Sequence, residues 1–148
     1  MSSNQARLGQ DSVGAWAKKY YFASREVMDS VLRPYNLGST QWYVLHQLAT
    51  NGPTPQRDLV IHLGIERATL SGIVATLVRK DLVAQEAGLS DQRQRILSLT
   101  ASGASLWEEL PDPIEVILAV AFEGASPKDL ATTFKVLQEA TLRLGKLA

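Results

Sequence analysis

The segment that most restricts the fold lies between residues 54 and 99, where two short helical patterns precede two strand-like runs. Thr54 and Pro55 predict an N-cap followed by the first residue of a helix, and Gly64 predicts the end of that helix. Apolar residues at three- and four-residue spacing predict a second helix over about residues 66–80. Two short helices therefore follow each other across a tight turn.

The second helix is followed by two strand-like runs, residues 82–86 and 95–99, which enclose a polar segment. This spacing predicts a two-stranded β-hairpin. Short helices followed by a hairpin are the order of a winged helix-turn-helix, in which one helix crosses the DNA backbone and the next enters the major groove. We expect residues 54–63 to form the supporting helix and residues 66–80 to form the reader helix.

Helical patterns also precede this segment. Apolar spacing predicts a helix from residue 11 that ends at Pro34, because proline cannot continue a helix. Ser39 and Thr40 are good N-caps and predict the start of a further helix, which stops at residues 51–53. In that helix we expect an apolar side to pack against the rest of the lobe.

The C-terminal third of the chain predicts helices that prolines interrupt. Thr100 can cap a helix, but Pro111 and Pro113 must kink or break it. Ser126 and Pro127 predict the N-cap and the first residue of the last helix. The expected fold class is therefore mainly α-helical with a small β-hairpin.

The composition agrees with one globular domain over residues 1–148. The chain has 148 residues, 45% of them apolar, and no cysteine, so its core needs no disulfide and thiol chemistry is excluded. The first ten residues lack the apolar core of a signal peptide, and the longest apolar run, Val116–Phe122, is too short to span a bilayer. We expect a cytoplasmic protein without membrane contact, in which helical arms over about 11–34 and 101–148 flank a winged helix-turn-helix lobe over about 39–100.

The formal net charge is zero, from 15 basic and 15 acidic side chains. A protein that coats DNA phosphates with lysine would be far more basic, so any contact with DNA must come from a few placed groups. Residues 101–148 have 4 basic and 7 acidic side chains. This acidic third keeps an alternative open, namely a winged-helix protein–protein interaction module that does not bind DNA.

The solvent side of the predicted reader helix has small and polar side chains, which allow close approach to base edges in the major groove. The turn of the hairpin offers a second contact, because an arginine on a protruding wing can enter a narrow minor groove. Arg93 is the candidate, and Asp91 can accept a hydrogen bond from Arg93 or a neighbouring arginine and so hold the turn. The predicted DNA-contacting residues are Arg67, Ala68, Thr69, Ser71, Gly72, Ala75, Thr76, Arg79, Asp91, Arg93 and Arg95.

The chain resembles the MarR family (multiple-antibiotic-resistance regulators) over nearly its whole length. The motif that carries this resemblance is D-x-R…L-T-x-x-G in the wing, matched by Asp91-Gln92-Arg93, five residues, and Leu99-Thr100-Ala101-Ser102-Gly103. The L-T-x-x-Q-x-x-x-L pattern is matched by Leu37, Gln41 and Leu45, apart from the spacing of Ser39-Thr40, and residues 65–83 match the family's reader helix and its run into the wing.

Two departures from the family's pattern affect the predicted geometry. Asp81 stands where the family usually has a helix-ending glycine, and an aspartate can adopt the left-handed conformation at some cost. Pro111-Asp112-Pro113 interrupts what is commonly one long helix, which affects the geometry expected for the dimer arms.

The resemblance implies a homodimer joined by its first and last helices, which binds a pseudo-palindromic DNA operator. It also implies repression that a small ligand relieves, often a phenolic compound or an aromatic acid. A two-fold dimer accounts for palindromy, because its two reader helices must meet two half-sites about 34 Å apart.

The first two predicted helices offer aromatic side chains together with one arginine and one histidine. Such a set would suit an aromatic carboxylate through ring stacking, apolar burial and a charge-assisted hydrogen bond. Aromatic residues at helical spacing also suit an ordinary core, and this alternative stays open. The candidate ligand-binding residues are Trp16, Tyr20, Tyr21, Arg25, Trp42 and His46.

No catalytic residue, cofactor or metal site is predicted. The sequence has no glycine-rich phosphate loop and no H-E-x-x-H motif, and His46 and His62 are its only imidazoles. An acidic cluster around the prolines is expected to be a solvated helix face rather than a cation site; its members are Glu108, Glu109, Asp112 and Glu115. A small-molecule binding protein or an enzyme that uses the aromatic pocket remains the second alternative to a DNA-binding regulator.

Overall fold

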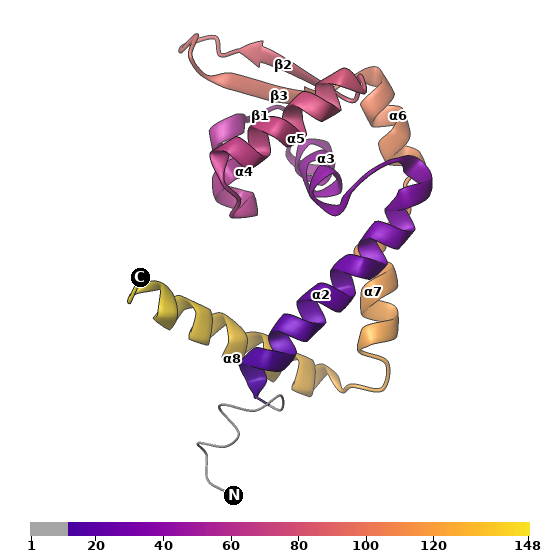
Figure 1. The fold of residues 1–148 in the computed structure, drawn as a ribbon, viewed down its shortest axis with the longest axis vertical. Coiled ribbons are helices and arrows are strands. Elements are labelled where there is room, and N and C mark those ends of the chain that lie inside the picture. Colours follow the sequence, from indigo (N-terminus) through magenta and orange to yellow (C-terminus); the bar gives the residue numbers. More distant parts are fainter. Residues whose placement is uncertain (1–11) are drawn as a thin grey trace, which may run out of the picture. The chain divides into compact units, whose positions relative to one another are not determined.

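The computed structural model describes residues 12–148, so the predicted start of the first arm at residue 11 lies outside the described residues. Contacts divide the chain into two compact units, one ending at Pro113 and the other comprising Ile114–Ala148. The elements in chain order are α2 (Val13–Leu32), the 3-10 helix η1 (Arg33–Tyr35), α3 (Ser39–Asn51), β1 (Thr54–Pro55), α4 (Gln56–Leu63), α5 (Arg67–Arg79), β2 (Val83–Ala87), β3 (Arg95–Leu99), α6 (Ala101–Glu109), α7 (Pro113–Ala121) and α8 (Pro127–Gly145) (Figure 1).

Helix α2 runs into η1 and then into α3 through a tight turn. Asn36 ends η1 in the left-handed conformation, with φ of 56°. Gly38 is the N-cap of α3, so the prediction that Ser39 or Thr40 caps this helix is wrong. Ser39 is instead the first helical residue, and its hydroxyl and backbone N–H are both bonded to side chains of α2.

Thr54 and Pro55 form the short strand β1, which pairs with β3, and the prediction of Thr54 as a helix cap is therefore wrong. Helix α4 begins one residue later than predicted, with Pro55 as its N-cap. Tertiary structure explains this difference, because the backbone of this segment pairs with the edge of β3, where Thr54 lies opposite Leu97. The sheet consequently has three strands in the order β1-β3-β2 instead of the predicted two.

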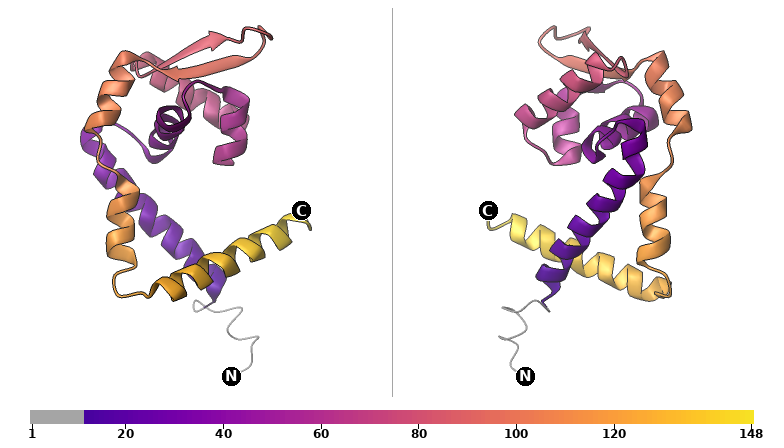
Figure 2. Two further views of the ribbon diagram at one scale, coloured as in Figure 1. Left: turned by 180° about the vertical axis from the view of Figure 1, so that it is seen from behind. Right: turned by 45° about the vertical axis from the view of Figure 1, so that its right-hand side comes forward.

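The predicted hairpin is confirmed, although β2 starts one residue later than expected. Strands β2 and β3 pair antiparallel from Val83 opposite Leu99 to Ala87 opposite Arg95. The turn that joins them projects away from the neighbouring helices, as two further views of the structure show (Figure 2). This protruding turn contains Asp91 and Arg93.

The first unit has a continuous apolar core, to which α2, α3, α4, α5 and β3 all contribute. Its most deeply buried aliphatic side chains are Leu32, Val44, Leu45, Leu59, Leu70, Leu77 and Leu97, each 0% exposed. In α5 the core side is formed by Leu70, Val74 and Leu77. Val78 follows Leu77 directly and is 40% exposed, because each residue of an α-helix turns the side chain by about 100°.

Helix α6 packs closely on the chain that leaves α5. Thr100 caps α6 as predicted, by accepting a hydrogen bond from the Gly103 N–H at 2.9 Å, and its own hydroxyl donates to the Asp81 carbonyl at 2.6 Å. A Cβ atom on Gly103 would lie 2.1 Å from the Leu82 carbonyl oxygen, so only glycine fits. Asp81 adopts the left-handed conformation, with φ of 59°, a region that glycine occupies at lower cost.

The prolines separate two helices rather than kink one, since α6 ends at Glu109 and α7 begins at Pro113. In the second unit, the predicted start of α8 is confirmed: Ser126 is its N-cap and accepts a hydrogen bond from the Asp129 N–H at 3.1 Å. No residue of α8 is buried.

Among residues 12–148, no single helix is long and apolar enough to cross a membrane. The pair α4 and α5 passes the same test of length and composition only when it is joined across a bend of 118°.

Candidate nucleic-acid interface

The residues predicted to read DNA lie on the solvent side of α5 and in the wing. On α5, Thr76 is half-buried and the other predicted residues are exposed; these are Arg67, Ala68, Thr69, Ser71, Gly72, Ala75 and Arg79. Thr76 accepts a hydrogen bond from Arg79 Nη2 at 2.9 Å, so this guanidinium lies along the helix instead of pairing with Asp81. The face has small side chains between its two terminal arginines.

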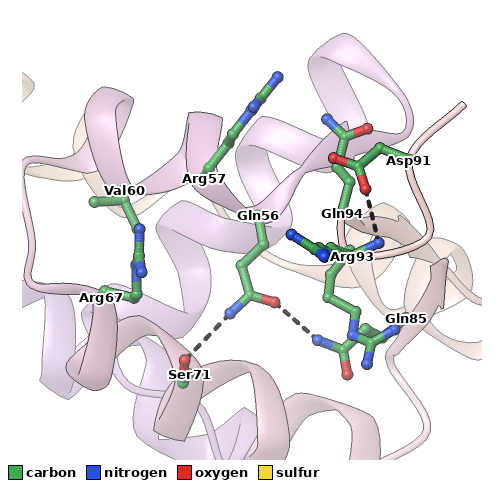
Figure 3. Close-up of a pocket in the computed structure, with 10 residues that line it drawn as sticks. Gln56, Arg57, Val60, Arg67, Ser71, Gln85, Asp91, Arg93 and Gln94 are labelled. Atoms are coloured by element: carbon green, nitrogen blue, oxygen red, sulfur yellow. Dashed lines mark hydrogen bonds between the residues drawn. The ribbon is translucent and has the colours of Figure 1, made fainter. Parts of the chain in front are cut away.

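A groove runs between α4, α5 and the wing, and we call it the arginine groove (Figure 3). It has a volume of about 470 Å³, and its polar lining comes from all three elements. The residues that line it are Gln56, Arg57, Val60, Arg67, Ser71, Gln85, Asp91, Arg93, Gln94 and Arg95.

The groove concentrates positive charge in a protein whose net charge is zero. Four arginines line it, whereas Asp91 is the one carboxylate among the lining residues. Arg57 also lies near a carboxylate outside the groove, with Nε 3.8 Å from Asp58 Oδ1. Arginines around one groove suit the phosphates of a nucleic-acid backbone, and the small side chains of α5 beside it leave room for base edges.

The wing turn is held by Asp91, although not through a guanidinium. Asp91 Oδ1 accepts a hydrogen bond from the Arg93 backbone N–H at 2.9 Å, and the Asp91 carbonyl accepts one from the Gln94 N–H at 3.0 Å. Both bonds fix the backbone around Arg93. The side chain of Arg93 therefore starts from a backbone whose conformation is fixed.

Gln56 joins the three walls of the groove. Its Nε2 donates to Ser71 Oγ on α5 at 3.3 Å, and its Oε1 accepts from Gln85 Nε2 on β2 at 2.8 Å (Figure 3). The sequence reasoning missed Gln56, Arg57 and Gln85, because their placement depends on the strand β1 and on the register of β2 with β3. No local motif marks these positions.

A second cavity, which we call the aromatic pocket, lies between α2, α3 and the end of α4. It has a volume of about 520 Å³ and brings Tyr21, Arg25 and His46 together, three of the six candidate ligand-binding residues. Arg25 donates to the Tyr21 hydroxyl and to Ser39 Oγ, both at 3.1 Å. The remaining lining residues are Ser24, Met28, Ser39, Thr40, Tyr43, Gln47, His62, Leu63 and Ile65.

The other three candidates lie outside the lining of this pocket. Trp16 and Tyr20 are 56% and 41% exposed on α2. Trp42 is 2% exposed and packs against the rings of His46 and Trp107, with centroids 5.1 and 5.5 Å away, so it belongs to the core of the first unit. Its spacing in the sequence is the same for either role, and only the fold separates them.

Tyr43, which the sequence reasoning did not single out, also lines the aromatic pocket. Partial burial raises the pKa of its phenol above 10.0, and the neighbouring Tyr21 raises that pKa further, while the Arg25 charge lowers it. Tyr43 therefore presents a neutral hydroxyl to the pocket at neutral pH. Within residues 12–148, no group of three or more acidic or histidine side chains is placed to hold a metal ion.

The comparisons with known proteins find one matching family profile and several regulators of transcription. A profile of the MarR family matches residues 35–94. The HTH-type transcriptional regulator FarR of Neisseria gonorrhoeae is 32% identical over 96 residues, which cover 62% of this chain and 66% of FarR. The match thus spans slightly less than two thirds of that relative.

Solved structures share the fold over most of the chain. BpsR of Bordetella bronchiseptica superposes with a TM-score of 0.79 at 24% identity, over 89% of this chain and 94% of that one. A mutant of MarR from Escherichia coli, in complex with operator DNA, superposes with a TM-score of 0.78 at 16% identity, over 95% and 99% of the two chains.

FarR is named as a transcriptional regulator and the MarR mutant was solved with operator DNA, which agrees with the prediction of a regulator rather than an enzyme. The fold class predicted from the order of helices and hairpin is likewise confirmed. The family profile covers the turn before α3, both helices beside the arginine groove and most of the wing turn. Residues 35–94 of this chain are thus similar to the MarR family, and the chain shares its fold with solved regulators of that kind.

Proposed function

We propose that this chain is a sequence-specific regulator of transcription. It binds double-stranded DNA as a homodimer and represses transcription from the bound site. The observation that carries the proposal is the arginine groove, which four arginines line beside the small-residue face of α5. The name of FarR as an HTH-type transcriptional regulator supports it, as does the operator DNA bound to the similarly folded MarR of Escherichia coli.

In this proposal α5 enters the major groove, where Thr69, Ser71 and Gly72 allow its backbone to approach the base edges. Arg93 extends from the wing into the adjacent minor groove, whose negative potential is strongest where it is narrow. Arg57 and Arg95 bind phosphates on either side, so their contribution is independent of sequence. A regulator of this kind works on DNA in the cytoplasm.

The dimer is supported by apolar side chains that the single chain leaves exposed on its first and last helices. Phe22 on α2 is 54% exposed, and Phe134 and Leu144 on α8 are 67% and 66% exposed. Covering such side chains with a second copy removes apolar area from water. A two-fold dimer then presents two α5 helices to a pseudo-palindromic operator.

The proposed effector is a small aromatic or phenolic acid in the aromatic pocket. Arg25 would bind its carboxylate, while Tyr21 and His46 would pack on its ring. Among proteins of the same fold, the DNA binding of BpsR is regulated by 6-hydroxynicotinic acid. The ligand would release DNA only by as much as it favours a state in which the α5 helices no longer match the operator.

The test is a fluorescence-anisotropy titration with a duplex from the region upstream of the gene, compared with a scrambled duplex at two salt concentrations. We expect tighter binding to the upstream duplex, weakened by salt because arginines displace counterions. If both duplexes bind equally and weakly, the next experiment is a selection of bound fragments from the whole genome, which would find an operator that lies elsewhere. If that selection recovers no preferred site, the protein–protein module is the better interpretation.

The effector is tested by adding 6-hydroxynicotinic acid or benzoate to the preformed complex. We expect release by at least one of them from the wild type and weaker release from Arg25→Ala. Lys18→Ala is the matched control, since it removes an exposed cation of the same helix that does not line the pocket. Equal release from Arg25→Ala and the wild type would exclude this pocket as the effector site.

A further inference from the structure

The turn before α3 is bonded both to a wall of the aromatic pocket and to the C-terminal end of α5. We infer that Arg25 and Lys80 are positioning residues that act through residues 36–41, which comprise this turn and the first three residues of α3, and so connect the pocket to α5. The inference rests on the proposed function for its biological meaning, since α5 is the proposed reader of DNA. The connection itself is made of hydrogen bonds within the first unit.

On the pocket side, α2 fixes the first residue of α3. Arg25 Nη2 donates to Ser39 Oγ at 3.1 Å, and Asp29 Oδ1 accepts from the Ser39 N–H at 3.3 Å. Arg25 and Asp29 are four residues apart and therefore neighbours on one face of α2. Ser39 is 4% exposed, so few alternative partners are available to it if Arg25 moves away.

On the reader side, Lys80 is the C-cap of α5 and reaches back to the same turn. Its ammonium donates to the Asn36 carbonyl at 2.5 Å and to Gln41 Oε1 at 3.2 Å. Gln41 Oε1 also accepts from the N–H of Gly38, the N-cap of α3, at 3.2 Å. A cation at this position also interacts favourably with the negative end of the α5 dipole.

The turn is compact, which makes independent movement of its two ends costly. Leu37 is 6% exposed and lies between Asn36, which is bonded to Lys80, and Ser39, which is bonded to Arg25. An anion that draws the Arg25 guanidinium into the pocket removes a donor from Ser39. The resulting shift of the turn changes the acceptors of Lys80 and so the position of the last turn of α5.

Hydrogen exchange of the free protein tests the connection without DNA or ligand. The informative amides are those of Asp81 and Leu82, which donate to the carbonyls of Val78 and Leu77 at 3.0 Å. We expect Arg25→Ala to speed their exchange about fivefold, and to add almost nothing in a Lys80→Met background. Equal acceleration by Arg25→Ala in both backgrounds, or none in either, would overturn the inference.

Two further variants keep this cycle interpretable. Ser39→Ala removes the acceptor of the same hydrogen bond with less loss of packing, and it replaces Arg25→Ala if that variant does not melt cooperatively. Lys18→Ala, an exposed cation elsewhere on α2, is expected to leave both amides unchanged. A merely structural role for Arg25 would slow or speed exchange throughout the lobe, whereas the connection acts at the end of α5.

The DNA experiment separates this inference from the proposed function. We expect Lys80→Met to bind the upstream duplex within about threefold of the wild type, and to lose most of the release caused by 6-hydroxynicotinic acid or benzoate. A non-additive exchange cycle in a protein that binds no duplex supports the connection and rejects the proposed function. Normal DNA binding with an additive cycle rejects the connection and keeps the proposed function.

Discussion

The two compact units differ most in how much apolar surface they bury for themselves. The first unit, which ends at Pro113, places aliphatic side chains from five elements in one core, and several of them are fully buried. In the described second unit, 114–148, Ile117 is the buried apolar side chain and α8 has none.

This difference indicates where each unit obtains its stability. Helices in proteins depend mainly on tertiary packing of their apolar faces, because intrinsic helix propensity contributes little stability by itself. The first unit supplies that packing itself. The apolar residues of α8, such as Phe134 and Leu144, are exposed in the single chain, so we expect α8 to depend on a second copy. Predictions about the two units therefore differ in their dependence on protein concentration.

The largest effect is expected from one substitution made in each unit, Leu45→Ala and Leu144→Ala. Leu45 is 0% exposed and Leu144 is 66% exposed. Removing the buried side chain leaves a cavity and should lower the free energy of unfolding by about 3 kcal/mol at any protein concentration. Leu144→Ala should cost under about 0.5 kcal/mol within one chain.

Urea unfolding at two protein concentrations, together with sedimentation, measures both variants. For Leu144→Ala we expect weaker dimerisation and a midpoint that depends more strongly on concentration. A concentration-independent loss as large as that of Leu45→Ala would mean that the second unit has an internal core of its own, and the comparison between the units would fail.

A second pair of variants adds one methyl group to a glycine in each unit. Gly103→Ala would place a Cβ atom 2.1 Å from the Leu82 carbonyl, whereas nothing lies within 4 Å of a Cβ on Gly145. We expect Gly103→Ala to cost about 2 kcal/mol or more, because the backbone of α6 must shift. Gly145→Ala at the end of α8 should be neutral or slightly stabilising. Thermal unfolding monitored by circular dichroism compares them, and equal midpoints would contradict the close packing of α6.

The DNA-binding prediction contrasts an arginine of the arginine groove with one on α8. Arg93→Ala should weaken binding to the upstream duplex about tenfold, or about 1.4 kcal/mol, and should reduce its salt dependence. Arg143→Ala removes a cation that lies 3.7 Å from Glu139 on an exposed helix, and it should leave the affinity unchanged. Anisotropy titrations at two salt concentrations measure both. An equal loss in the two variants would indicate a general effect of charge instead of a placed contact.

The sequence predicted those features of the fold that depend on residues close together in the chain. Thr100 and Ser126 cap their helices as expected, and Asp81 is left-handed as its place after α5 required. The failures involve distant partners. Thr54 has the local signature of a helix cap, yet it pairs with Leu97, a residue more than forty positions away.

The candidate sites show the same division. The small residues of α5 and the arginines of the wing were identified because helix periodicity and a short motif place them on exposed surfaces. Gln56 and Gln85 meet only once β2 is in register with β3 and α4 has been docked beside them. The aromatic spacing on α3 does not distinguish core from cavity, so the sequence leaves both roles open for Trp42, and the fold places it in the core.

The smallest expected effect concerns local backbone strain. In both units, glycine should be more stable than a residue with a side chain at a position with positive φ. Asp81 has φ of 59°, and Gly124 in the second unit has φ of 83°, where an added Cβ atom would have no neighbour within 4 Å. Asp81→Gly stabilises the fold by removing a side chain from the left-handed region. Two losses oppose this gain: the long 3.4 Å hydrogen bond from Ser102 is lost, and glycine raises the entropy of the unfolded chain. We expect a net stabilisation of about 0.5 kcal/mol, with the opposite sign for Gly124→Ala. Urea unfolding at high protein concentration measures both changes, and a loss of stability in Asp81→Gly would show that the Asp81 carboxylate contributes more than its conformation costs.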